Sequence, residues 1–149
     1  IALRVCTMKI NIEILNQLKS LSLSAPHPKV WIASALVHRN RIISYGLNQM
    51  KTHPYQYRYG RNSESIYWHA ETSAIYTADK KLNFTKFESS VLYVARMKFD
   101  SSEKRNYISG MAKPCAGCMK CIRHYDIKTV IYTLNEEDIC DTNFGVLVL

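Results

Sequence analysis

The chain has 149 residues, a length typical of one domain that buries its own core without disulfides. Its apolar content is ordinary for a globular protein, and no apolar run is long enough to cross a bilayer, so we expect no membrane partner. The formal net charge of +8 favours a phosphate-bearing partner, either a nucleotide or a nucleic acid backbone, although solubility alone also explains such an excess. Residues 1–7 are too short for a signal peptide, so we predict one domain over 8–149 after a non-native or disordered leader.

The first part of the domain predicts a helix followed by a hairpin. Residues 9–21 carry isoleucines and leucines at a mostly helical spacing. Residues 29–37 are rich in β-branched and small apolar residues, which is typical of a buried strand. A short polar turn then leads into a second strand over 41–45, so these two strands are expected to pair.

Residues 46–62 lack apolar periodicity and predict a long loop. The loop carries Lys51, His53, Arg58 and Arg61, with tyrosines between them and no acidic residue. Long irregular loops inside compact domains are usually functional or disordered, and the tyrosines argue against disorder. We therefore expect the basic side chains to contact a substrate phosphate and His53 to be a candidate substrate contact, with a solvated basic loop as the alternative.

The second part of the domain predicts helices alternating with strands. A helix is predicted over 63–81, with Ser63 as its N-cap and a face of small residues for close packing on a sheet. After it we predict a strand parallel to a neighbour, and a last strand that is antiparallel, because the link before it is short for a crossover helix. The predicted elements are a strand at 91–95, a polar loop at 96–113, a helix at 115–125, and strands at 128–133 and 145–149. The pattern indicates one α/β domain.

The five cysteines are an odd number, and three of them, Cys115, Cys118 and Cys121, lie close together in the sequence. Such clustering favours metal binding in a reducing compartment over a framework of disulfides. We therefore expect a cytoplasmic protein.

Two short motifs carry the chemistry: His69-Ala70-Glu71 and Pro114-Cys115-Ala116-Gly117-Cys118. Zinc favours nitrogen and thiolate donors, and a catalytic site uses three protein ligands and keeps a fourth position open. Cys115 and Cys118 are three residues apart, so their sulfurs face the same way on a helix or tight turn. The sequence therefore predicts a zinc site with ligands His69, Cys115 and Cys118, and Glu71 as a catalytic residue free to move protons.

A Cys-x-x-Cys pair alone is a weak signal, because structural zinc sites and redox pairs share it. A closed structural site could recruit Cys121 as a fourth ligand, but such a site has no use for Glu71 at this spacing. Cys121 lies near Cys118 on the predicted helix, and we interpret it as a small buried residue, with a spare ligand as the alternative.

The order of H-x-E and P-C-x-x-C is the signature of zinc nucleobase deaminases. The chain resembles the cytidine deaminase-like superfamily, which includes cytidine, deoxycytidylate, guanine and tRNA-adenosine deaminases, over nearly its whole length from about residue 9. The resemblance implies a three-layer α/β/α sandwich with a five-stranded mixed sheet of order 2-1-3-4-5. It places the zinc ligands at His69, Cys115 and Cys118 and the proton shuttle at Glu71, and by analogy it implies a homo-oligomer.

The resemblance also implies two substrate contacts. Gly46-Leu47-Asn48 is similar to a G-x-N segment of the deoxycytidylate and tRNA-adenosine branches, in which the asparagine hydrogen-bonds the substrate, so Asn48 is expected to bind substrate. The backbone N–H of Ala70 is expected near the carbonyl oxygen of the base. Trp68, directly before the histidine ligand, is a candidate for stacking on the base, with core packing as an equally good alternative.

The expected reaction is hydrolytic deamination. Zinc lowers the pKa of its bound water toward about 7, and hydroxide attacks the ring carbon that bears the amine. Glu71 takes the water proton and passes protons to the ring nitrogen and to the leaving amine, which departs as ammonia.

Three functions compete at this point. A deaminase of deoxycytidylate, or of a related cytosine nucleotide or nucleoside, is favoured by the small single domain and its compact basic loop. A polynucleotide deaminase, acting on tRNA adenosine or on cytosine in single-stranded DNA, is favoured by the wide spread of positive charge and the interleaved tyrosines. The third is a non-catalytic zinc-binding assembly domain, against which Glu71 argues.

Overall fold

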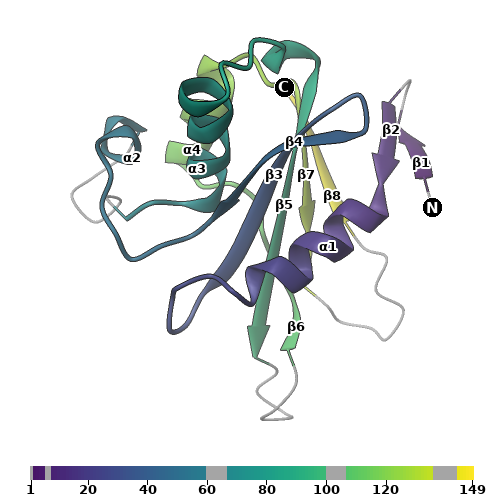
Figure 1. The fold of residues 1–149 in the computed structure, drawn as a ribbon. Helices are drawn as coiled ribbons and strands as arrows, with labels where there is room; N and C mark the ends of the chain where they lie inside the picture. The colour runs from purple at the N-terminus through teal and green to yellow at the C-terminus, as the bar shows by residue number, and fades with distance from the viewer. Residues whose placement is uncertain (1, 6–7, 60–66, 100–106, 136–143) are drawn as a thin grey trace.

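The computed structural model describes residues 2–5, 8–59, 67–99, 107–135 and 144–149 (Figure 1). Its first elements are β1 (Ala2–Val5), β2 (Met8–Asn11), α1 (Ile12–Ser22), β3 (Trp31–His38), β4 (Arg41–Leu47) and α2 (Pro54–Tyr59). After these come α3 (Ala70–Tyr76), the helical turns η1 (Thr77–Lys81) and η2 (Phe87–Ser89), β5 (Ser90–Phe99), β6 (Tyr107–Gly110), α4 (Ala116–His124), β7 (Thr129–Thr133) and β8 (Phe144–Val148). No helix among the described residues is both long and apolar enough to cross a membrane.

A mixed sheet lies at the centre of the molecule. Its main path is β4-β3-β5-β7-β8, and β6 pairs with β5 off this path. β5 and β7 are parallel, whereas the other neighbouring strands are antiparallel. The predicted parallel pairing of the strand after α3 and the predicted antiparallel last strand are therefore confirmed. The predicted number of strands is wrong, because five were predicted and the described residues form a sheet of six. The predicted order 2-1-3-4-5 holds only along the main path.

The sixth strand comes from the segment 96–113, which was predicted to be a polar loop. β5 continues to Phe99, and β6 pairs with its last four residues. Aromatic side chains hold this extension together, since the Trp31 ring contacts those of Phe99 and Tyr107 edge to face at 5.3 and 5.5 Å between centroids. Aromatic residues favour strands, and here that preference outweighs the charges of the segment.

The central strands alternate their side chains between two hydrophobic cores. On β5, Leu92 and Val94 belong to the core that contains residues of α4 and η1, whereas Tyr93 and Ala95 belong to the core that contains residues of α1. Figure 1 shows α1 on one face of the sheet and α3 and α4 on the other. We call these the α1 face and the α3–α4 face. The predicted α/β class is confirmed.

α1 begins at Ile12 rather than at residue 9, because the residues before it pair as β1 and β2. Asn11 is its N-cap: the Asn11 side chain accepts the Glu13 N–H at 3.0 Å, and the Asn11 backbone N–H donates to the Tyr93 hydroxyl at 3.0 Å. These bonds fix the start of α1 on β5. Within the segment interpreted as a leader, residues 2–5 form β1, and the rest of the segment lies outside the described residues.

α3 lies close against β3 and β4. The hydroxyls of Ser34 and Ser44 donate to the carbonyl oxygens of Ala70 and Ala74 at 2.6 and 2.7 Å. Gly46 leaves no space for a side chain, because a Cβ there would collide with the Ala70 carbonyl oxygen and lie 2.6 Å from the Ala74 nitrogen. Ala70 and Ala74 are completely buried, so the predicted small-residue face is confirmed.

Two predicted boundaries next to this helix are wrong. The segment 46–62 is not one irregular loop, because it contains α2. The following helix begins at Ala70 rather than at residue 63, since the His69 backbone is extended (φ −81°, ψ 156°) and His69 is the N-cap. The predicted cap, Ser63, lies outside the described residues.

Candidate metal centre and active site

The three predicted ligands come together on the α3–α4 face. His69 Nδ1 lies 3.2 Å from Cys118 Sγ and 3.6 Å from Cys115 Sγ. All three ligand atoms lie within 4.8 Å of one another. Nitrogen and sulfur ligands of a tetrahedral zinc, at about 2.0–2.3 Å from the metal, stand about 3.5 Å apart. One nitrogen and two thiolates at these separations fit zinc.

The starts of two helices position the ligands. His69 is the N-cap of α3 and Cys115 is the N-cap of α4. Cys118 lies in the first turn of α4, and its backbone N–H points to Cys115 Sγ at 3.5 Å. The two sulfurs therefore lie on the same side of this turn, as their spacing predicts.

Glu71 lies in the first turn of α3, two residues after the histidine, and only 5% of it is exposed. Burial raises the pKa of the Glu71 carboxyl, and the neighbouring imidazole of His69 opposes that rise. A carboxyl with a raised pKa takes up and releases protons closer to neutral pH, which is what a proton shuttle requires.

The two ligand cysteines have opposite acidities in the metal-free site. A hydrogen bond from the Cys118 thiol lowers the pKa of Cys115 to about 3, against the effect of burial. The same hydrogen bond, followed by burial, raises the pKa of Cys118 well above its ordinary value. The hydrogen bond with Cys115 also raises the pKa of His69. Cys115 is therefore the first thiolate, and metal binding must displace a proton from Cys118.

Comparison with known protein families matches residues 8–134 to the cytidine and deoxycytidylate deaminase zinc-binding region. The chain belongs to this family. A search of curated protein sequences finds no match. The match covers both motifs and all elements from β2 to the end of β7. Together with the His-Cys-Cys cluster, it supports a zinc-dependent deaminase that acts on a nucleobase.

Cys121, the alternative fourth ligand, lies apart from the cluster of this deaminase domain. It is fully buried in the hydrophobic core of the α3–α4 face, with its sulfur 3.8 Å from the Tyr55 hydroxyl. Burial raises the pKa of the Cys121 thiol to about 12, so the thiol is neutral at physiological pH. This environment agrees with the interpretation of Cys121 as a small buried residue.

The side chain of Asn48 is bonded to the protein backbone. Its Oδ1 accepts the Ile32 N–H and its Nδ2 donates to the Val30 carbonyl, both at 2.9 Å. Asn48 therefore extends the β3–β4 pairing by one step and fixes the start of the segment that leads to His69. Ala70 is the first residue of α3, where a helix leaves the backbone N–H without an intrahelical partner.

Trp68 and His53 form a stacked pair beside the histidine ligand. Their rings lie 3.9 Å apart at 20°, and Tyr76 meets both rings edge to face. His53 Nδ1 accepts the Tyr55 N–H at 3.1 Å. Lys51 and Arg58 are exposed, and Arg61 lies outside the described residues. The structure thus brings Trp68 and His53 together and leaves Lys51 and Arg58 in solvent.

Two further residues on the α3–α4 face were not predicted from the sequence as site residues. Gln56 of α2 is fully buried, its Oε1 accepts the His69 N–H at 3.1 Å, and its Nε2 has no partner among the described residues. Arg96 was assigned to a polar loop but lies in β5. Its Nε is buried and has no hydrogen-bond partner among the described residues. The strand alternation running from Leu92 and Val94 would have placed Arg96 on the α3–α4 face.

Proposed function

We propose that the chain is a hydrolytic deaminase of a cytosine nucleotide, with deoxycytidylate as the first choice. One observation carries the proposal: a buried carboxyl, Glu71, lies in the same helical turn as the histidine of a His-Cys-Cys cluster. A metal site that only stabilised the fold would gain nothing from an acidic group held there at the cost of burying it.

The protein groups around the cluster have separate roles in this proposal. When bound, zinc would supply a Lewis acid that makes water nucleophilic at neutral pH. Glu71 takes one proton from the attacking water and delivers it to the ring nitrogen, and then carries the second proton of the same water to the leaving amine. A C–N bond is thereby replaced by a C–O bond, and ammonia leaves. The Ala70 N–H donates to the carbonyl oxygen of the base, and the Trp68–His53 pair forms an aromatic wall.

Arg96 supports a nucleotide over a nucleoside. Arg96 pairs with Ile32 in the β3–β5 register, two residues along the strands from the Ser34–Val94 pair and on the same face of the sheet. The Ser34 hydroxyl donates to the carbonyl oxygen of Ala70, the first residue of α3. Among the described residues the Arg96 side chain makes no ion pair and leaves its buried Nε unpaired. A buried guanidinium nitrogen that none of the described residues pairs with, on the α3–α4 face that also carries the metal cluster, suits a phosphate.

Ammonia release by zinc-loaded protein tests the proposal. We expect the highest kcat/KM for deoxycytidylate among cytosine, deoxycytidine, deoxycytidylate, adenosine and short oligonucleotides. Faster release from an oligonucleotide, with binding that weakens steeply as salt is added, would instead indicate a polynucleotide deaminase. No ammonia from any of these substrates would contradict the proposed reaction.

The Arg96→Gln variant tests the phosphate contact in the same assay. We expect KM for deoxycytidylate to rise about tenfold or more, the effect of losing one charge-assisted hydrogen bond, while KM for deoxycytidine stays unchanged. Arg123→Gln, an exposed arginine on α4, is the matched control and should change neither value. Equal changes for both substrates would remove Arg96 from phosphate recognition.

A further inference from the structure

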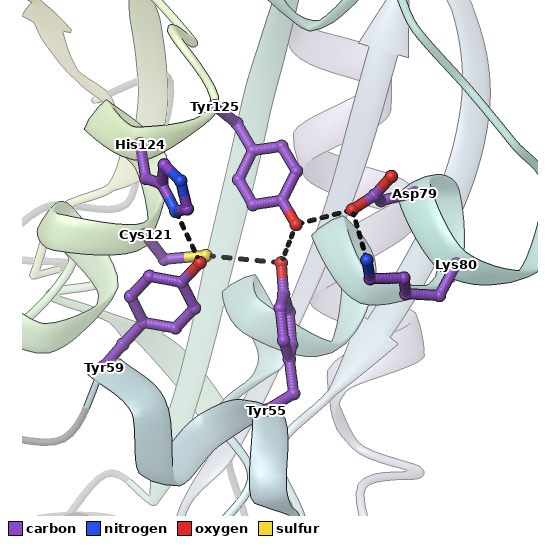
Figure 2. A network of polar contacts seen from close by, with 7 residues as sticks. All are labelled: Tyr55, Tyr59, Asp79, Lys80, Cys121, His124 and Tyr125. Carbon is purple, nitrogen blue, oxygen red and sulfur yellow. Dashed lines mark hydrogen bonds and ion pairs between the residues drawn. The ribbon is translucent and has the colours of Figure 1, made fainter.

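α2 connects the two helices that carry the ligands. On the α4 side, the Tyr55 hydroxyl donates to the Tyr125 hydroxyl at 2.7 Å, and the Tyr59 hydroxyl lies 2.8 Å from His124 Nδ1 (Figure 2). Tyr125 in turn donates to Asp79 of η1, directly after α3, at 2.6 Å. Figure 2 shows these side chains converging from three segments of the chain. α2 is therefore fixed to α4 by its tyrosines.

The contact of α2 with the start of α3 is made by Gln56. Its Oε1 accepts the backbone N–H of His69 at 3.1 Å and also accepts the Thr72 hydroxyl. The Gln56 side chain is fully buried, so water does not replace either bond. A single carbonyl oxygen thus bonds the N-cap residue and the third residue of the zinc-ligand helix.

This arrangement supplies what α3 cannot supply for itself. In a capping box, the N-cap side chain bonds the third residue of the helix, and the side chain of that residue returns to the N-cap N–H. His69 makes no side-chain cap bond, and its imidazole lies in the metal cluster. The third residue, Thr72, bonds the His69 carbonyl at 3.1 Å rather than its N–H. The His69 N–H therefore depends on Gln56.

We propose that Gln56 is a positioning residue for the metal ligand His69. Its Oε1 bonds the protein rather than a metal, and it fixes the backbone from which the imidazole extends toward Cys115 and Cys118. The inference rests on the zinc site of the proposed function, and it assigns to α2 the task of presenting one ligand to a metal whose other two ligands are on α4.

Zinc affinity, measured by competition with a chromogenic chelator, tests the role of Gln56. Gln56→Met keeps the length of the side chain and removes the acceptor, so we expect zinc affinity to fall about tenfold or more, as for the loss of a buried hydrogen bond. Tyr55→Phe is the matched control on the same helix, because it removes the bond to Tyr125 and leaves both the Tyr59–His124 contact and the His69 contact in place. We expect the zinc affinity of Tyr55→Phe to stay within about twofold of the wild type, which is a change of under about half a kcal/mol in binding free energy. Equal affinity in wild type and Gln56→Met would overturn the proposal.

A second variant and a spectrum separate positioning from folding. Gln56→Glu keeps the acceptor oxygen, so we expect zinc affinity at least equal to that of the wild type, and a tenfold loss would overturn the proposal even if Gln56→Met did not fold. In Co²⁺-loaded protein, the visible absorption bands report ligand geometry, and they should change in Gln56→Met and not in Tyr55→Phe. Unchanged affinity and bands contradict the role of Gln56, whereas absence of ammonia release from zinc-loaded wild type contradicts the deaminase proposal instead.

Discussion

Glu71 combines two properties that oppose each other, because it is an acidic side chain and almost completely buried. Burial disfavours its charged form, and the neighbouring His69 imidazole reduces that penalty without removing it. The spacing of Glu71 from His69 predicted its role as the residue that moves protons. Its burial could not be predicted from the sequence, because it depends on how closely α3 packs on β3 and β4.

Replacing Glu71 with alanine separates proton transfer from metal binding. Because Glu71 is not one of the three ligands, we expect Glu71→Ala to bind one zinc per chain as the wild type does. Its kcat should fall by about 10²–10⁴-fold or more, the usual contribution of a general acid–base group. Metal analysis and ammonia release measure the two effects, and the exposed Glu88→Ala is the control. An active, zinc-replete Glu71→Ala protein would remove the assigned role.

The acidities of the cysteines predict their order of alkylation. In metal-stripped protein at pH 5, Cys115 is above its pKa of about 3 and is a thiolate, whereas Cys121, with a pKa of about 12, is a buried neutral thiol. We expect iodoacetamide to modify Cys115 well before Cys121, and zinc to protect Cys115. Peptide mass spectrometry locates the label. Faster modification of Cys121 would contradict the assignment of Cys115 as the thiolate and Cys121 as the neutral thiol.

At the scale of elements, α2 shows where the sequence interpretation failed and what signal was present. The lack of apolar periodicity over residues 46–62 suggested a loop rather than a helix, and the alternating tyrosines argued only against disorder. In the structure Tyr55 and Tyr59 are each 4% exposed and Tyr57 is 70% exposed, which is the i, i+4 pattern of one helix face. Pro54 at the first helical position was a second signal. The six-residue helix is too short to produce a clear period, and tertiary contacts decide its formation.

The close packing of α3 on β4 predicts the effect of a single methyl group. A Cβ at Gly46 would collide with backbone atoms of α3 that cannot move separately, so Gly46→Ala should displace the helix and its ligand. We expect a loss of about 1–3 kcal/mol in the free energy of unfolding, together with weaker zinc binding. Urea denaturation and chelator competition measure the two quantities.

Gly110→Ala is the matched control for this substitution. A Cβ there would approach only the flexible side chain of Arg96, at 3.2 Å, so we expect a small effect on both quantities. Equal losses in the two variants would show that the contact of Gly46 with α3 is not the cause.

At the scale of the whole molecule, the resemblance to deaminases implied the main path of the sheet. The residues themselves predicted the α/β class and the convergence of the ligands. These follow from strong signals, namely apolar runs of strand length and a motif whose residue types fit one metal. β6 was missed because its pairing depends on a long-range contact of Trp31 with Phe99 and Tyr107. The role of Gln56 was missed for a similar reason, since its partners are in another helix.

The separation of the ligands along the chain has a kinetic consequence. His69 and Cys115 are 46 residues apart, and α3, η1, η2, β5 and β6 lie between them in the chain. Closing this long stretch of chain costs entropy before the three ligand atoms can meet, so we expect the high-affinity site to form late in folding. Interactions that form after the transition state slow unfolding and leave the folding rate unchanged. We therefore expect zinc to slow the unfolding of the domain and to change its folding rate little.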